Sequence, residues 1–176
     1  MRGRVSLAVA AVLAVLVVAG LAAAPLLSGT SASPRWSVPA RGAGPTTVEV
    51  SADVARHPWG EAVRAQLQRH FDAINAKDYA QWRETVVPER AEALPEPAWQ
   101  EAYRSSRDGS IRIVRIDDAP GGGVLVRLRF VSTQDVADAP PDLPVERICW
   151  RSTLPMTGLP PRIARTGDGS SDAAAC

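Results

Sequence analysis

The chain has 176 residues, and its 20 basic residues nearly cancel its 19 acidic ones, giving a formal net charge of +1. Outside Arg2 and Arg4 the balance is 18 basic against 19 acidic residues, net −1, so nucleic acid is not an expected partner. Apolar residues make up 45% of the chain, which excludes both a disordered protein and a small disulfide-dense one.

The N-terminus carries a long apolar run. Residues 5–27 contain no charged side chain, and as a helix they reach roughly 34 Å, enough to span a hydrocarbon core of about 30 Å. Arg2 and Arg4 precede the run, and the positive-inside rule keeps residues 1–4 in the cytoplasm. The sequence therefore predicts a single transmembrane anchor at 5–27, with the rest of the chain outside the cytoplasm.

A cleaved signal peptide is the alternative interpretation of this run. Ala22-Ala23-Ala24 fits the small-x-small pattern of a cleavage site, although Pro25 would follow the cut. The run is also longer than the roughly 7–15 apolar residues typical of a signal peptide. Both interpretations place the remaining domain outside the cytoplasm.

Residues 28–56 are expected to form a flexible linker. In 28–46, 12 of 19 residues are Ser, Thr, Gly or Pro, a composition that buries too little apolar surface to offset its ordering entropy. Trp36 is the exception, and it suits either a membrane interface or an ordinary exposed position.

Three helices follow. Residues 57–76 are predicted to form a long amphipathic helix, because apolar residues recur on one stripe: Trp59, Val63, Leu67, His70, Phe71 and Ile74. Asp78 is placed to cap a second helix that Pro88 ends. A third helix is predicted from Pro97 to Ser106, with Gly109 as its stop.

After Gly109 the hydrophobic period changes to two, which indicates strands. The first strand is expected to contain a bulge between Val114 and Arg115, and residues 120–123 form a turn. Further strands are predicted at 124–130, 144–154 and 162–166, followed by a tail at 168–176. The fold class is α+β: three N-terminal helices packed on a curved antiparallel sheet of about four strands, preceded by one transmembrane helix.

The stretch HFDAINAKDYAQW at 70–82 resembles the nuclear transport factor 2-like (cone-shaped α+β) superfamily. A long first helix, a short polar break and a second helix that opens with an aromatic residue are typical of that superfamily. The resemblance covers roughly residues 57–167. It implies a cone whose mouth, between sheet and helices, holds an apolar ligand or a partner peptide. The superfamily contains enzymes and non-catalytic envelope domains alike, so the fold does not determine function.

The candidate binding residues are His70, Trp82 and Tyr103. His70 lies within the apolar stripe of the first predicted helix, where it is either a core histidine or a general base. A base needs a partner carboxylate. Asp72 points to the opposite side of the helix, and the predicted strands offer only Asp117, Asp118 and Glu146. The sequence therefore predicts no catalytic residue, and packing alone explains the aromatic residues as well as ligand binding does.

Cys149 and Cys176 are the only two cysteines, and outside the cytoplasm we expect them to form a disulfide. This disulfide would attach the tail to the 144–154 strand. No metal site is predicted, because the two Cys and two His lack ligand spacing, and no cofactor is indicated. Seven arginines fall on predicted strands, and they form either a solvated face or a contact for an anionic partner or lipid headgroups: Arg112, Arg127, Arg129, Arg147, Arg151, Arg162 and Arg165.

Together these features predict a membrane-anchored, extracytoplasmic binding or scaffolding domain without intrinsic catalysis. Its expected partners are the membrane, through the N-terminal helix, and an apolar small molecule or an envelope protein. One alternative is a small cone-fold enzyme of the isomerase or dehydratase type that uses His70. The other is an accessory subunit of an envelope transport assembly, similar in layout to membrane-anchored accessory proteins of actinobacterial lipid importers.

Overall fold

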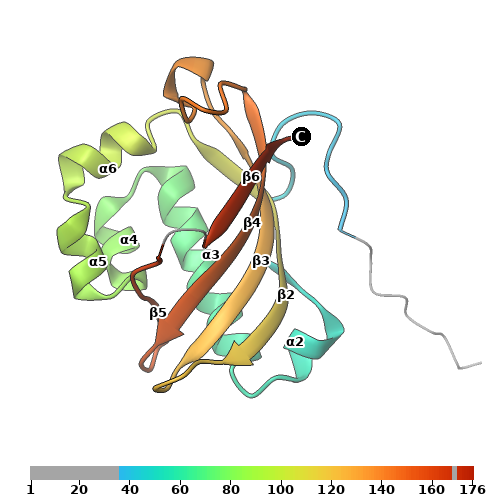
Figure 1. The fold of residues 1–176 in the computed structure, drawn as a ribbon, viewed down its shortest axis with the longest axis vertical. Coiled ribbons are helices and arrows are strands. Elements are labelled where there is room, and N and C mark those ends of the chain that lie inside the picture. The colour runs from blue at the N-terminus through green and yellow to red at the C-terminus, as the bar shows by residue number, and fades with distance from the viewer. Residues whose placement is uncertain (1–35, 168–169) are drawn as a thin grey trace, which may run out of the picture. The chain divides into compact units, whose positions relative to one another are not determined.

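The computed structural model describes residues 36–167 and 170–176 (Figure 1). The predicted anchor at 5–27, the cytoplasmic end at 1–4 and the first part of the linker lie outside the described residues. Within the described ranges, no helix combines the length and apolarity that crossing a membrane requires.

The described chain is α+β. Its helices are α2 (Ala52–Arg56), α3 (Gly60–Ala76), α4 (Tyr79–Thr85), α5 (Pro88–Ala93) and α6 (Glu96–Ala102), with a short 3₁₀ turn at Val136–Asp138. Its strands are β1 (Glu49–Val50), β2 (Arg107–Asp118), β3 (Val124–Thr133), β4 (Arg147–Thr157), β5 (Arg162–Ile163) and β6 (Ser171–Ala175).

The strands form one sheet in the order β1-β2-β3-β4-β5, with β6 also paired to β4. β2, β3 and β4 pair antiparallel, whereas β1 pairs parallel to β2. β5 pairs with the end of β4 at Met156, and β6 pairs with its beginning at Ile148. The sheet is therefore mixed, and it has more strands than the four-stranded antiparallel sheet that the sequence predicted.

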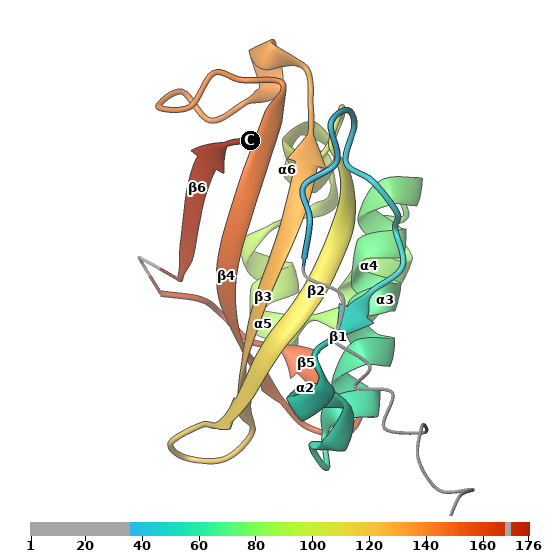
Figure 2. The ribbon, with the colours of Figure 1, turned by 90° about the vertical axis from the view of Figure 1, so that its right-hand side faces the viewer.

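Helix α3 has the buried face that its hydrophobic pattern predicts, but it begins at Gly60, so Pro58 precedes the helix instead of lying in its first turn. Val63, Leu67, Phe71 and Ile74 recur on one face and are all buried against the sheet. The helix ends at Lys77, whose left-handed backbone (φ 60°) stops the α-helical pattern. Figures 1 and 2 show α3 to α6 gathered on one side of the sheet, so the core lies between these two layers.

The helices after α3 are shorter and more numerous than predicted. Asp78 caps α4 as expected, accepting a hydrogen bond from the Gln81 backbone N–H at 2.9 Å. Pro88 does not end that helix, however: α4 ends at Thr85, and Pro88 occupies the first turn of α5. Pro97 likewise lies in the first turn of α6. Proline lacks the N–H that a helix start does not use, so it suits the first turn of both helices. This confirms the predicted start of a helix near Pro97 and corrects Pro88 from a helix end to a helix start.

Strand β2 begins at Arg107, and this corrects the role assigned to Gly109. That residue lies within the strand instead of stopping a helix. A Cβ on Gly109 would lie 2.5 Å from the Gly44 carbonyl oxygen, so only glycine lets the N-terminal segment approach this closely. Farther along, the register shifts between Ile113 and Arg115, which confirms the predicted bulge at Val114.

Part of the predicted linker is packed against the sheet. The Trp36 indole donates to the Ser110 carbonyl at 2.6 Å, and Arg147 donates to the Pro39 carbonyl at 2.9 Å. β1 and α2 also fall within the range 28–56. In Figure 1 the segment that begins at residue 36 runs along the side of the sheet away from α4 to α6. Hydrogen bonds to its backbone carbonyls, or from its side chains to carbonyls of the sheet, hold it there, together with one from the Ser110 backbone N–H to the Pro45 carbonyl. These bonds do not depend on an apolar composition.

The predicted disulfide between Cys149 and Cys176 is present, with the two Cα atoms 5.1 Å apart. The residues expected to form a loose tail are in fact strand β6, which pairs with β4 from Ile148 to Ser152. The side chains of this strand are exposed, so composition alone gave no signal for it.

Candidate functional site

A cavity of about 510 Å³ lies between the helices and the sheet. One part of its wall is apolar and largely aromatic: Phe71, Ile74, Phe130, Ile148, Trp150 and Leu154. The Phe130 ring lies 5.1 Å from Phe71 and 6.0 Å from Trp150, measured between ring centroids. Ten polar residues also line the cavity: His70, Arg90, Tyr103, Ser106, Asp108, Ser132, Gln134, Asp138, Ser152 and Ser171. Cavities of this size and lining are typical of small-molecule sites.

Two of the three predicted binding residues line this cavity, namely His70 and Tyr103. Trp82 does not. It is 1% exposed and packs in the core between Tyr79 and Trp99, at centroid distances of 5.5 and 5.7 Å. The shared helical spacing did not distinguish a core aromatic residue from one at the cavity, because both face the sheet.

The hydrogen bonds of His70 determine its tautomer. The Thr85 hydroxyl donates its only hydrogen to the Trp82 carbonyl at 2.6 Å. It therefore accepts from His70 Nδ1, 2.7 Å away, and Nδ1 carries the proton. Burial, with a smaller contribution from Arg90, lowers the pKa of His70 to about 3. The ring is thus neutral at physiological pH, and its Nε2 is a hydrogen-bond acceptor.

Asp108 is a cavity residue that the sequence did not suggest. It is 4% exposed, and its Oδ1 accepts a hydrogen bond from the Ser132 hydroxyl. Two hydrogen bonds between its backbone and the Asn75 amide, of 2.8 and 2.9 Å, hold it against α3. Burial raises the pKa of Asp108 to about 6, although Ser132 and Lys77 act in the opposite direction. The strand had been predicted to begin after Gly109, so Asp108 was excluded from the sheet.

Arg90 is the second polar residue that the sequence did not indicate. It reaches the cavity from α5, a helix that was not predicted, and its Nη1 donates to the Ala164 carbonyl at 3.1 Å. Burial lowers the pKa of Arg90. Among the described residues it makes no ion pair.

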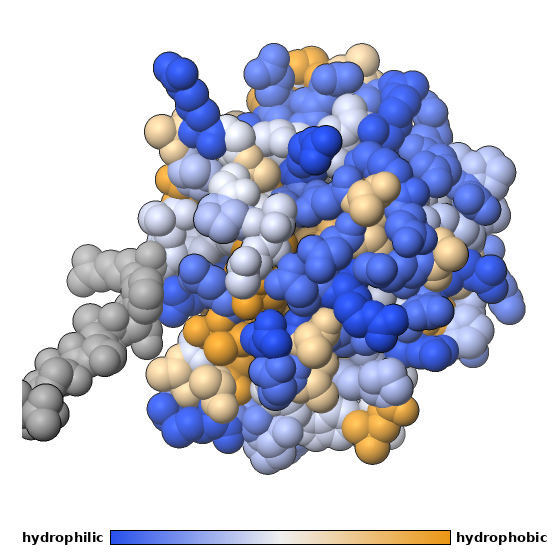
Figure 3. All heavy atoms as spheres, turned by 180° about the vertical axis from the view of Figure 1, so that it is seen from behind, coloured by the Kyte–Doolittle hydropathy of each residue, from blue (hydrophilic) through white to orange (hydrophobic). Residues whose placement is uncertain are grey.

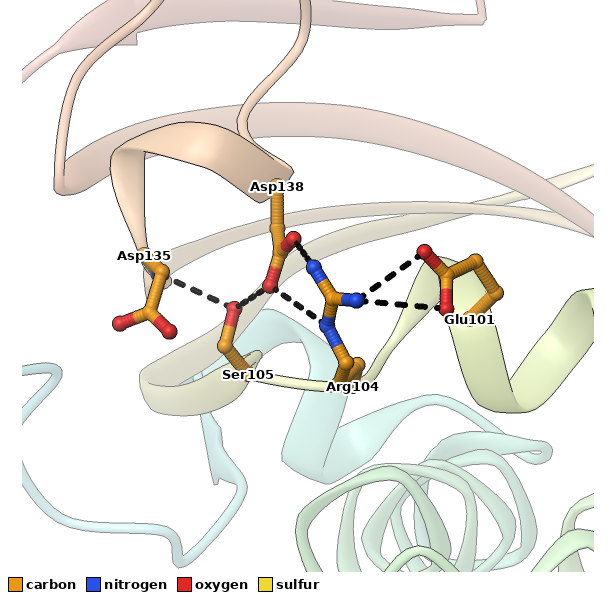
Figure 4. Close-up of polar contacts among 5 residues, drawn as sticks. All are labelled: Glu101, Arg104, Ser105, Asp135 and Asp138. Atoms are coloured by element: carbon orange, nitrogen blue, oxygen red, sulfur yellow. Dashed lines mark hydrogen bonds and ion pairs between the residues drawn. The ribbon is translucent and has the colours of Figure 1, made fainter.

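The loop between β3 and β4 closes one side of the cavity, to which Asp138, Ala139, Pro140 and Pro141 contribute. Asp138 attaches this loop to the end of α6 (Figure 4). It pairs with the Arg104 guanidinium and accepts a hydrogen bond from the Ser105 hydroxyl at 2.5 Å. Ser105 in turn accepts from the Asp135 backbone N–H at 3.0 Å. These contacts lower the pKa of Asp138, Arg104 contributing most, so its carboxylate stays ionised.

The opposite face of the sheet carries arginines, as one interpretation of the sequence expected. Arg129 lies directly across from Arg112 on one neighbouring strand and from Arg151 on the other, so the three side chains share a face. Acidic residues continue the same row at both ends, Glu49 beside Arg112 and Asp172 beside Arg151. The row thus consists of three neighbouring arginines with one acidic residue at each end.

The exterior seen in Figure 3 is mainly hydrophilic, and its apolar residues lie in small separate groups. Across residues 36–167 and 170–176, no group of three or more His, Cys, Asp or Glu side chains is arranged to hold a metal ion. Comparisons of the chain with protein-family models, curated proteins and solved structures find no match.

Proposed function

We propose that this domain binds a small molecule with an apolar body and a polar end in the cavity between its helices and sheet. The observation that supports this proposal is the cavity itself, which has a volume of about 510 Å³, a partly aromatic wall and several polar side chains. Burial of apolar ligand surface there supplies the affinity, and the polar groups orient the ligand.

We propose binding without catalysis, because His70 lacks the arrangement that a general base needs. Its Nδ1 is bonded to a hydroxyl, Thr85, and no carboxylate of the described residues orients the ring. A pKa of about 3 also makes the ring a weak proton acceptor at neutral pH. His70 Nε2 therefore serves as a hydrogen-bond acceptor for a bound ligand.

The membership of the nuclear transport factor 2-like superfamily and the location outside the cytoplasm remain part of the proposal. Helices on one side of a sheet, with a cavity between the layers, support the first. The apolar run at 5–27 and the disulfide support the second, because disulfides persist in oxidising compartments. On this proposal the domain is held at the cell membrane, where it captures an apolar molecule.

Photolabelling tests the binding proposal with a site-resolved readout. The full-length protein is irradiated with a medium-chain alkyl alcohol that carries a diazirine, and labelled peptides are identified by mass spectrometry. We expect labels on the peptides that contain Phe71, Phe130 and Trp150. Labelling confined to the apolar run at 5–27 would overturn the proposal.

Two substitutions on neighbouring residues of β4 provide the matched control. Ser152 lines the cavity, whereas Thr153 does not line it and points to the other face of the sheet. Ser152→Phe is expected to reduce cavity labelling at least about tenfold by filling the space, and Thr153→Phe to leave it unchanged. Near-UV circular dichroism verifies that both variants are folded.

A further inference from the structure

Arg90 is the one arginine or lysine that lines the cavity within the described residues. Its Nη1 donates to the Ala164 carbonyl, and its other guanidinium N–H groups have no acceptor among the described residues. It makes no ion pair there either. The cation is half-buried, and burial disfavours its charge enough to lower the pKa of the group.

A guanidinium does not lose its proton in proteins, so it cannot relieve this cost by becoming neutral. The charge therefore creates a positive potential inside the cavity. The charge of Arg90 acts on two other residues that line the cavity, because it contributes a lowering of the pKa at both His70 and Tyr103. An unpaired, partly desolvated cation next to apolar surface is complementary to an anion with an apolar body.

A second donor lies at the same part of the cavity. The Tyr103 hydroxyl has no hydrogen-bond partner among the described residues, and burial, followed by the charge of Asp108, raises its pKa. The hydroxyl thus keeps its proton at neutral pH and can donate it to a ligand oxygen. Arg90 and Tyr103 thus each offer a hydrogen-bond donor to an acid group in the cavity.

We infer that the cavity binds an apolar carboxylate, whose acid group contacts Arg90 and Tyr103 while its hydrocarbon body lies against Phe71, Phe130 and Trp150. This inference rests on the proposed function, and it specifies the ligand class. Asp108 and the ionised Asp138 also line the cavity, so the acid group is expected at the Arg90 side, where the potential is positive.

The test compares two competitors of equal chain length, a medium-chain fatty acid and the corresponding alcohol. Each competes with the diazirine alcohol for cavity labelling of the full-length protein. We expect the acid to compete at a concentration at least about tenfold lower than the alcohol. Arg90→Gln should reduce this preference to less than about threefold, mainly because the fatty acid then binds more weakly. Arg90→Lys should retain part of the preference.

Arg83→Gln is the matched control, because it removes the same charge from an exposed position on α4 outside the cavity. It should leave the preference for the acid unchanged. Undiminished labelling of Arg90→Gln by the diazirine alcohol shows that the variant keeps a folded cavity. If Arg90→Gln is not labelled, the carboxylate inference is decided by the preference for the acid in the wild type and in Arg90→Lys.

The outcomes separate the two proposals. If the diazirine alcohol labels the wild-type cavity but acid and alcohol compete equally, the carboxylate inference is overturned and the binding proposal stands. An acid preference that survives in Arg90→Gln also overturns the inference, because the preference then has another source. If the cavity is not labelled, both proposals fail.

Discussion

His70 and Asp108 line the same cavity, yet burial moves their pKa values in opposite directions. Burial disfavours the charged form of each group, so it lowers the pKa of His70 from 6.5 to about 3 and raises that of Asp108 from 3.8 to about 6. Between pH 6.5 and 3 the unfolded chain binds more protons at His70, so this residue makes stability fall as the pH falls. Between pH 3.8 and 6 the folded chain binds more protons at Asp108, so that residue makes stability fall as the pH rises.

Replacing His70 by glutamine tests the first of these effects. At pH 7 we expect His70→Gln to lower the free energy of unfolding by about 1–3 kcal/mol, because the buried hydrogen bond to Thr85 and the ring contacts with Phe71 and Trp82 are lost. Wild-type stability falls by about 1.4 kcal/mol per pH unit below pH 6.5 through this histidine, whereas glutamine does not titrate. The difference should therefore shrink toward zero near about pH 5.

Urea unfolding followed by tryptophan fluorescence measures this difference at both pH values. Arg64→Gln, at a partly exposed position on the same helix where Arg64 pairs with Glu61, is the control and should shift stability by no more than about 0.5 kcal/mol. A difference between His70→Gln and wild type that stays constant with pH would contradict the buried, neutral histidine.

Replacing Asp108 by asparagine should stabilise the protein at high pH. Asparagine keeps an acceptor for the Ser132 hydroxyl but carries no charge to bury. The wild-type carboxylate costs on the order of 3 kcal/mol once it ionises above about pH 6. We expect Asp108→Asn to raise the free energy of unfolding by up to that amount at pH 8 and to change it little at pH 4. Equal stabilities at both pH values would show that Asp108 is not desolvated in the folded state.

At the scale of elements, β6 depends on its disulfide more than on packing. All five of its residues are exposed, and its contacts are backbone pairing with β4, the Ser152–Ser171 hydroxyl contact at 2.8 Å and the Cys149–Cys176 bridge. The bridge joins residues 27 positions apart, a loop for which the chain-entropy model gives about 3–4 kcal/mol.

Removing the bridge should therefore release β6 before the rest of the sheet. In the Cys149→Ser/Cys176→Ser double variant we expect fast amide hydrogen exchange over 171–175 and a free energy of unfolding lowered by up to about 3–4 kcal/mol. Exchange in β2 and β3 should change little under native conditions. Slow exchange of 171–175 in the double variant would show that pairing alone holds the strand.

The loop between β3 and β4 provides a second prediction at this scale. Asp138→Ala removes both the ion pair with Arg104 and the hydrogen bond from Ser105 that attach the loop to α6 (Figure 4). Because this loop closes one side of the cavity, we expect a bound apolar molecule to dissociate several-fold faster. Asp142→Ala, an exposed change in the same loop, should leave the rate unchanged. Equal dissociation rates in the two variants would mean that the loop attachment does not control access.

For the whole molecule, we predict that the chain remains at the membrane with its full N-terminus. The apolar run at 5–27 after Arg2 and Arg4 is the reason. In cell fractionation the protein should stay in the membrane pellet after a high-salt wash and enter the soluble fraction only with detergent. Mature protein in the medium that begins near Ala32 would instead establish the signal-peptide alternative.

Local patterns in the sequence were sufficient for features that one segment specifies by itself. The period of α3 gave its buried face, including His70, and the alternation on β3 separated Val126 and Leu128 from the arginines. The bulge at Val114 appeared as a break in the alternation of β2. The two cysteines allowed one pairing within the chain, and the structure contains it. For the helix face, the alternation and the bulge, the information lies in residues adjacent along the chain; for the disulfide it lies in the cysteine count.

The cavity and its polar groups were decided by tertiary structure. Asp108 precedes the point where alternation begins, and Arg90 lies on a short helix without a clear apolar stripe. Both line the cavity because α5 and β2 border the same space. The packing of 36–46 likewise depends on hydrogen bonds between side chains and backbone carbonyls that link it to β2 and β4, and β6 depends on backbone pairing with β4. Hydrophobic periodicity reports which side of an element is buried. It carries no information about the distance between elements, and that distance determines whether buried side chains meet in a packed core or leave a space for a ligand.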